Sequence, residues 1–434
     1  MKKKIILILL FIIMSGVLFI TYKKDVLAYP SVFPTGVTIN KPEAYQGYTT
    51  FAINEEEGKG STIYIIDMQG DVLHKWKIEN VGTMHNYLLK NGHLVSNIRS
   101  KEKCPVMGCL SAVEERDWDG NVVWRYENDN LHHPIEVRPD GSIVAIYWEV
   151  LPQVLSSQIK GGIPNTEGKN GETITDVIRI VNHDKEVVWE WYPHEELSIA
   201  DWPLSPPETR QYWPNINRVK YLSEGNPFNG KESLLVSFRK IDTLAIIDIE
   251  TKKIVWKWGE KDIAHQHDPH LLNNGNILVF DNGYHRTEPD KKKFSRILEI
   301  NPRINKIIWE YNGSEVNVKN GFGFYSFIGG FVERLPNWNS LITETTTGRI
   351  FEVNQEGEIV WEYVHPVAGV DSVFRFSPDE VDWPEKLPSP VGNKWKVKIS
   401  DYLQYAGWLV ALLSLLLLVL NSRALKRKIK PHKS

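Results

Sequence analysis

One pattern of apolar and polar positions recurs six times along the chain and predicts its fold. An apolar run is followed by a polar turn, and the turn is followed by a second apolar run that ends in tryptophan. The tryptophans that end the copies are Trp76, Trp124, Trp189, Trp256, Trp309 and Trp361. Alternating residues on both sides of an Asp-Gly or Asn-rich turn are typical of a β-hairpin. We therefore expect six hairpins with these tryptophans at equivalent positions.

A second hairpin pattern alternates with the first. It occupies residues 88–95, 137–144, 271–278 and 335–342, with a degenerate copy at 219–236 that turns at Gly230. Two hairpins in each unit of about 50 residues form a four-stranded sheet, which needs neighbouring units to bury both of its faces. Six such sheets stacked around an axis form a β-propeller. The sequence therefore predicts an all-β, six-bladed β-propeller over residues 25–370.

Two stretches depart from this pattern. Residues 151–175 contain several glycines and break the repeat, which indicates a loop inserted over one face of the propeller. Residues 371–400 are rich in proline, and we expect them to connect the propeller to the C-terminal segment.

Apolar runs at both ends of the chain indicate membrane segments. Residues 5–20 are mostly apolar and follow three lysines, so we expect an uncleaved signal-anchor helix over 1–24; a cleaved signal peptide is the alternative. Residues 406–420 are also apolar and precede many lysines and arginines, which predicts a second helix over 401–422 and a basic tail over 423–434. By the positive-inside rule both tails face the cytoplasm. The propeller is then the extracytoplasmic domain of a multi-pass protein of the cell membrane.

The composition excludes several other classes of protein. The formal net charge is -3, so the chain lacks the basic excess that a nucleic-acid partner requires. The two cysteines, Cys104 and Cys109, are too few for a disulfide scaffold, a multi-cysteine metal site or an iron–sulfur cluster. In an oxidising compartment we expect these two residues to form a disulfide across a tight loop; two free thiols are the alternative.

Histidines recur at one position of the repeat. In a propeller the innermost strands line a central channel, so equivalent positions in different blades face one volume. His85, His133 and His267 each lie six or seven residues before the turn of the second pattern, and we expect them to share a central pocket. A polar strand start that simply recurs with the repeat is the alternative. Neighbouring candidates for substrate binding are Asn217, His132 and His270.

Charged residues follow the next strand of several repeats. Arg286 lies in the loop that leaves the strand after the 271–278 turn, and we expect it to return toward the channel. Its planar guanidinium would suit a tetrahedral oxyanion such as sulfate or phosphate. A surface salt bridge with Glu288 or Asp290 is the alternative. Three residues follow the equivalent strands of other blades, and each could likewise face the channel or form a surface salt bridge: Arg99, Arg239 and Glu344.

A metal site is not expected. His265 and His267 fall on one strand face, where two imidazoles can bind one ion. Pro269 breaks that strand, however, and we find no matching cluster of carboxylates or cysteines elsewhere in the sequence. We therefore predict neither a metal nor an organic cofactor.

These features resemble the bacterial arylsulfate sulfotransferase family. The resemblance covers about residues 60 to 365 and rests on the Gly-x-Val-Val-Trp strands, on the His-Asp pair at 267–268 with the turn after it, and on Phe-Asp-Asn-Gly at 280–283. It implies an exported six-bladed propeller that moves a sulfuryl group between phenols without a nucleotide donor. A channel histidine carries the sulfuryl group in this family. His267 and Arg286 match its sulfate-binding positions, and His133 (or His132) resembles an earlier channel histidine.

One departure separates the chain from the family. The carrier histidine is expected at the strand start over residues 324–330, and no histidine occurs there. Either His267, His133 or Tyr325 takes this role, or the chain has diverged to other chemistry or to binding only. We expect an arylsulfotransferase-like enzyme that acts on an aryl sulfate and a phenol, with His267, His133 and Arg286 as catalytic residues. A ligand-binding or scaffold propeller of a membrane complex is the alternative. A quinone-dependent dehydrogenase fits less well, because six units are fewer than we expect for that class.

Overall fold

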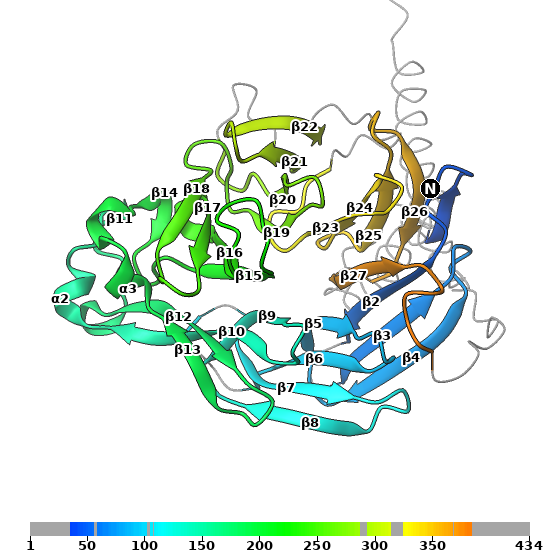
Figure 1. Cartoon of the computed structure of the whole chain (residues 1–434), viewed down its shortest axis with the longest axis horizontal. Helices are drawn as coiled ribbons and strands as arrows, with labels where there is room; N and C mark the ends of the chain where they lie inside the picture. The colour runs from blue at the N-terminus through cyan, green and yellow to red at the C-terminus, as the bar shows by residue number, and fades with distance from the viewer. Residues whose placement is uncertain are drawn as a thin grey trace, which may run out of the picture. The chain divides into compact units, whose positions relative to one another are not determined.

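The computed structural model describes residues 35–383, except 56–58, 102–104, 107, 287–292, 314–323 and 368. Within these residues, six antiparallel sheets surround one central axis, as Figure 1 shows. The chain is therefore an all-β, six-bladed β-propeller, and the predicted fold class is confirmed.

Each blade is a sheet of four antiparallel strands, named here from the axis outward. The first blade comprises β27 (Val370–Phe376), β2 (Tyr48–Asn54), β3 (Gly60–Ile66) and β4 (Val72–Glu79). The second comprises β5 (Thr83–Leu88), β6 (Leu94–Arg99), β7 (Leu110–Arg116) and β8 (Val122–Glu127). The third comprises β9 (Leu131–Val137), β10 (Ile143–Leu151), β12 (Thr173–Val181) and β13 (Val187–Trp191).

The remaining three blades follow in chain order. The fourth comprises β15 (Ile216–Leu222), β16 (Ser233–Phe238), β17 (Thr243–Asp248) and β18 (Ile254–Trp258). The fifth comprises β19 (His267–Leu271), β20 (Ile277–Asp281), β21 (Arg296–Asn301) and β22 (Lys306–Asn312). The sixth comprises β23 (Phe331–Arg334), β24 (Ser340–Glu344), β25 (Arg349–Val353) and β26 (Ile359–Val364), and β1 (Gly36–Asn40) pairs with the outer side of β26.

The ring closes within the first blade. Its innermost strand, β27, comes from the C-terminal end of the propeller and pairs with β2, which lies near the N-terminal end. Residues from 371 onward were predicted to form a connector, and the structure corrects this boundary because β27 extends to Phe376. Joining both ends of the propeller in one sheet closes the ring between the sixth blade and the first.

The six tryptophans of the repeat lie on the fourth strand of each blade counted from the axis, at equivalent positions, as predicted. Each indole Nε1 donates a hydrogen bond to the following blade. The pairs are Trp76 to Asp117 O, Trp124 to His183 O, Trp189 to Ile249 O, Trp256 to Asn305 Oδ1, Trp309 to Gln355 O and Trp361 to Met68 O, at 2.9 to 3.1 Å. The last pair joins the sixth blade to the first, so these bonds connect the whole ring.

Apolar side chains fill the space between facing sheets. Between the third and fourth blades, for example, Ile146 and Ile178 belong to the same buried cluster as Val219 and Val236. Each sheet is thus covered on both faces by its neighbours, which is why a single repeat has no stable core of its own.

The innermost strands depart from regular pairing where they begin. The register with the next strand shifts in the pairs that involve β5, β9, β15, β19 and β27. His133, Asp268 and Ser372 lie in these segments with φ of 57°, 49° and 56°. Such bulges redirect side chains, and here they occur near the beginning of the innermost strands.

Two insertions follow strands of the third blade. The first contains α2 (Gln153–Ser156), β11 (Gly161–Ile163) and η1 (Lys169–Gly171), and the second contains α3 (Pro193–Glu196), η2 (Ile199–Asp201) and β14 (Leu204–Thr209). β11 and β14 pair in parallel, so the two insertions form one unit. The sequence predicted the first insertion but not the second.

Several predictions fall outside the described residues. Both predicted membrane helices, the N-terminal signal-anchor and the C-terminal helix over 401–422, lie in the terminal segments that the description omits. Among residues that are described, no helix is long and apolar enough to span a membrane. The predicted disulfide also remains a prediction, because Cys104 lies outside the described residues, while Cys109 is buried.

Candidate functional site

Two arginines and two histidines gather where the inner strands begin. Arg99 ends β6, Arg239 begins η3 (Arg239–Ile241) directly after β16, His133 lies in β9, and His267 begins β19. Burial holds the pKa of His133 well below its ordinary value, and electrostatic interactions with the neighbouring His132, His267, Arg239 and Arg99 lower it further. Four residues from four blades therefore form one electropositive group, which we call the channel-mouth site: Arg99, His133, Arg239 and His267.

The tautomer of His267 is determined by Asn282. The Asn282 amide donates through Nδ2 to the backbone oxygens of Ser326 and Gly329, at 2.7 Å each. Its Oδ1 must then accept a hydrogen bond, and Nδ1 of His267 lies 2.7 Å from it. Nδ1 also lies 3.0 Å from the backbone oxygen of His265. Nδ1 of His267 therefore carries the proton, and Nε2 retains its lone pair.

Burial and the nearby Arg239 favour the neutral form of His267. Burial lowers its pKa to about 3, and the positive charge of Arg239 contributes in the same direction. A neutral imidazole with an available Nε2 lone pair has the chemistry of a nucleophile or a base.

His133 is oriented through a second histidine. Nδ1 of His133 lies 2.6 Å from Nδ1 of His132, and Nε2 of His132 lies 3.1 Å from Oδ1 of Asp176. The Asp176 carboxylate also accepts a hydrogen bond from the Tyr212 hydroxyl and, at 2.9 Å, from the Ile216 backbone N–H. The carboxylate favours a proton on Nε2 of His132, so Nδ1 of His132 accepts from Nδ1 of His133. The lone pair of His133 is then on Nε2.

A second cluster of charged groups occupies the channel. Nε of Arg218 lies 3.2 Å from Oδ1 of Asp268, and Nη2 of Arg218 lies 3.2 Å from Nε2 of His85. Oδ2 of Asp268 lies 3.0 Å from Nε2 of His270. Burial lowers the pKa of His85 far below its ordinary value, and Arg218 and Lys220 act in the same direction. His85 and His270 therefore belong to this internally paired cluster, whereas His133 and His267 belong to the channel-mouth site.

Asp371 connects the two groups electrostatically. Its side chain on β27 is buried, which raises its pKa to about 7, while the charges of Arg99 and Arg218 act in the opposite direction. Near neutral pH a large share of this carboxyl group is protonated. A protonated Asp371 does not neutralise Arg99, so the arginine retains its charge for an anionic ligand.

The other predicted residues make contacts elsewhere. Arg286 donates from Nη1 to Oδ2 of Asp281 and, at 2.8 Å, from Nη2 to the backbone oxygen of Phe294. Oε1 of Glu344 accepts the Tyr325 backbone N–H at 3.1 Å. Of the residues predicted at the channel, Arg286 and Glu344 are therefore held by neighbours in their own part of the fold. Asn217 likewise serves the backbone, donating at 2.8 Å to the Gln266 oxygen.

The segment over residues 324–330, where the carrier histidine was expected, ends in a glycine that has no room for a side chain. Gly330, which directly precedes β23, has a φ of 100°, and a Cβ there would lie 2.6 Å from the Phe280 ring. Any side chain at this point would overlap that ring and would adopt a backbone conformation that favours glycine. Phe280 thus explains in physical terms why no histidine replaces Gly330.

Sequence reasoning missed three residues that shape the channel-mouth site. Asp176 and Asp371 carry no motif, and Asn282 was noted only as part of the Phe-Asp-Asn-Gly run. Of the three, only Asn282 had a usable signal, because it directly follows the strand that pairs with the one bearing His267.

Solved structures resemble the chain at low identity. A protein of unknown function from Bacteroides caccae is 13% identical, covers 76% of this chain and 99% of its own, and has a TM-score of 0.48. A catalytically inactive virginiamycin B lyase from Staphylococcus aureus with quinupristin is 12% identical, covers 76% and 89%, and has a TM-score of 0.39. No curated protein matches the chain in sequence. The arylsulfotransferase (ASST) family model, in contrast, matches residues 85–366, which is more than half of the chain and includes the whole channel-mouth site. The chain belongs to the arylsulfotransferase family.

Proposed function

We propose that the chain transfers a sulfuryl group from an aryl sulfate to a phenol, without a nucleotide donor, at the channel-mouth site. The observation that carries this proposal is the arrangement of His267, whose Nδ1–H is held by Asn282 and whose Nε2 lone pair belongs to a site with two arginines. A family match over residues 85–366 supports the same class of reaction.

His267 replaces the missing carrier in the first step. Its Nε2 attacks the sulfur of the aryl sulfate, the bond between sulfur and the aryl oxygen breaks, and the phenolate leaves with the electron pair. Arg99 and Arg239 hold the sulfonate oxygens, where fixed donors stabilise charge that develops in the transition state. The positive charge on the sulfated ring is stabilised through Nδ1–H, which donates to Oδ1 of Asn282.

His133 serves the second step as a general base. The acceptor phenol gives its proton to Nε2 of His133 while its oxygen attacks the sulfur. The bond between sulfur and His267 breaks, and its electron pair returns to Nε2. His132 and Asp176 hold His133 in the tautomer that accepts this proton.

The proposal includes an extracytoplasmic, membrane-anchored location. Apolar runs at residues 5–20 and 406–420 with basic neighbours support it. Protease added outside intact cells should then leave the C-terminal basic tail intact, and cleavage of that tail would reverse the proposed orientation.

A second candidate is a propeller that binds sulfate esters without transferring the group. The segment over residues 324–330 favours it, because it contains no histidine and the Phe280 ring leaves no room for a side chain at Gly330. This candidate retains the two arginines as an anion site and assigns no covalent role to His267.

A transfer assay separates the two candidates. The full chain in detergent receives 4-nitrophenyl sulfate and phenol with no nucleotide, and release of 4-nitrophenol and formation of phenyl sulfate are both measured. We expect transfer by the native protein, a loss on the order of 10³-fold or more in His267→Ala, and a loss of about 100- to 1,000-fold in Arg239→Gln. His183→Ala, which alters an exposed histidine on another blade, is the matched control. Binding of 4-nitrophenyl sulfate without any transfer would support the second candidate.

A further inference from the structure

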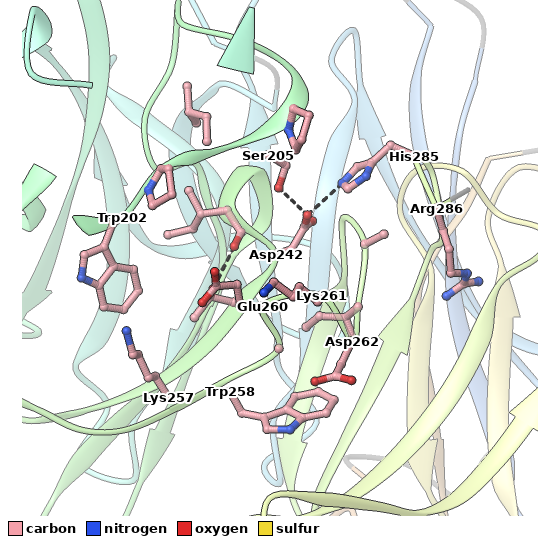
Figure 2. A pocket seen from close by; sticks show the side chains of 18 of the residues that line it. Trp202, Ser205, Asp242, Lys257, Trp258, Glu260, Lys261, Asp262, His285 and Arg286 are labelled. Carbon is pink, nitrogen blue, oxygen red and sulfur yellow. Dashed lines mark hydrogen bonds and ion pairs between the residues drawn. The ribbon is translucent and has the colours of Figure 1, made fainter. Parts of the chain in front are cut away.

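A cavity lies beside the second insertion, and none of the four channel-mouth residues is among the residues that line it. Its volume is about 640 Å³, and its lining includes Trp202, Ser205, Asp242, Trp258 and His285. Figure 2 shows the Ser205 and His285 side chains pointing toward Asp242 in its wall. The cavity thus contains a carboxylate that several polar groups approach.

Three residues in this region bring ligand atoms together. Asp242, His265 and His285 each offer one nitrogen or carboxylate oxygen, and these atoms all lie within 4.8 Å of one another. Nε2 of His285 lies 2.9 Å from Oδ2 of Asp242. Ligands of one transition-metal ion bound at about 2.0 to 2.2 Å lie roughly 3 to 3.5 Å apart. A modest rotation of these side chains would therefore place the three atoms around one ion.

One buried ring nitrogen in this group has no partner. The His265 side chain is only 1% exposed, and among the described residues its Nδ1 has no hydrogen-bond partner, whereas its Nε2 faces the Glu208 carboxylate. Nε2 of His285 faces the Asp242 carboxylate. Buried polar atoms normally have partners, so Nδ1 of His265 requires an explanation. An ion shared by the two rings and the Asp242 carboxylate would supply the missing partner.

The Glu208 carboxylate lies next to the His265 ring. Its Oε1 lies 2.7 Å from Nε2 of His265, and its Oε2 lies 3.1 Å from Nζ of Lys240. A carboxylate beside one nitrogen of a histidine whose other nitrogen binds a metal is a common arrangement, because it orients the ring and raises its basicity. The pair with Lys240 keeps Glu208 in place.

We propose that Asp242, His265 and His285 bind a divalent transition-metal ion, with Zn²⁺ as the reference ion. Two imidazoles and one carboxylate suit Zn²⁺ and leave at least one coordination position for water. Asp242 and His285 both line the cavity, so this position faces it. The site also stabilises the segment before β19, because the backbone N–H of His265 donates at 2.8 Å to Oδ1 of Asp242.

The test measures metal binding directly. Full-length protein without a polyhistidine tag is stripped with a chelator and titrated with Zn²⁺ against a chromophoric competitor, and Co²⁺ is added in a parallel experiment to record its visible d–d spectrum. We expect one equivalent of Zn²⁺, a Co²⁺ spectrum typical of nitrogen and oxygen ligands, and a rise in the thermal midpoint on Zn²⁺ addition. In His285→Ala the affinity should fall at least about 100-fold, and in Glu208→Gln about 10- to 100-fold with the stoichiometry unchanged.

His183→Ala again serves as the matched control and should bind Zn²⁺ as the native protein does. Circular dichroism establishes that each variant is folded, and Asp242→Asn provides a second loss of a ligand. A native chain without a stoichiometric Zn²⁺ site would overturn the proposal. So would a folded His285→Ala or Asp242→Asn variant that binds as tightly as the native protein. Neither result depends on sulfuryl transfer.

Discussion

Raising the pH from about 5 to about 8 should destabilise the protein through Asp371, and Asp371→Asn should remove this part of the pH dependence. Burial raises the pKa of Asp371 from 3.8 to about 7. The unfolded chain therefore releases this proton at lower pH than the folded chain does. Between the two pKa values the folded state binds more protons, so the free energy of unfolding falls as the pH rises. At about 1.4 kcal/mol per pH unit, the expected loss is about 2 to 3 kcal/mol over this range.

Urea unfolding followed by tryptophan fluorescence at both pH values tests this expectation. The change in the free energy of unfolding between the two pH values is compared for the native protein and Asp371→Asn. The difference between these two changes is the contribution of the Asp371 carboxyl group alone. Asp379→Asn, which alters an exposed residue shortly after the same strand, should leave the pH dependence unchanged. If Asp371→Asn loses as much stability as the native protein between the two pH values, Asp371 is not protonated in the folded state. The electrostatic description of Arg99 would then be wrong.

Three further substitutions test the packing and the site. Trp309→Phe removes one hydrogen bond between blades and weakens the contact with a neighbouring arginine, so urea unfolding should show a free energy of unfolding that is lower by about 1 to 2 kcal/mol. As a control, replacement of an exposed tryptophan in Trp338→Phe should change the free energy of unfolding by less than about 0.5 kcal/mol. Asn282→Ala removes the side chain that fixes the His267 tautomer, and turnover in the transfer assay should fall about 10- to 100-fold; an unchanged rate would refute the tautomer argument. Gly330→Ala should lower the free energy of unfolding by about 2 kcal/mol or more, because φ at this position is 100° and the new methyl group overlaps the Phe280 ring. An unchanged free energy in urea unfolding would contradict the steric explanation.

The fold was predictable because each repeat carries its own hairpin signals. Trp76 and its five equivalents mark the outer strands, and the polar turns mark the inner ones. The hydrogen bonds between blades were not predictable, because most of the acceptors are backbone carbonyl groups that any residue type supplies. Asp371 shows a related limit. It was assigned to a connector because no local pattern reveals that β27 returns to pair with the first blade.

The candidate site was predictable only in part. His133 and His267 share a repeat position, and in the structure they interact electrostatically. The same reasoning failed to separate His85 from them, because position along an inner strand does not reveal which charged neighbours a side chain will meet. The partner of Arg286 could not be predicted either, although it lies only a few residues away in the sequence. Spacing indicated the loop in which it lies, but its partner, Asp281, depends on side-chain conformation.

The central claim is that His267 carries the sulfuryl group, and trapping the intermediate tests it most directly. The full chain is mixed with 4-nitrophenyl sulfate in the absence of an acceptor, quenched under alkaline conditions, and examined by intact and peptide mass spectrometry. We predict the addition of one SO₃ group to the chain, located on His267, and its loss when phenol is added before quenching. An SO₃ group located on His133 or Tyr325 instead of His267 would contradict the account. Efficient sulfuryl transfer by His267→Ala would also contradict it.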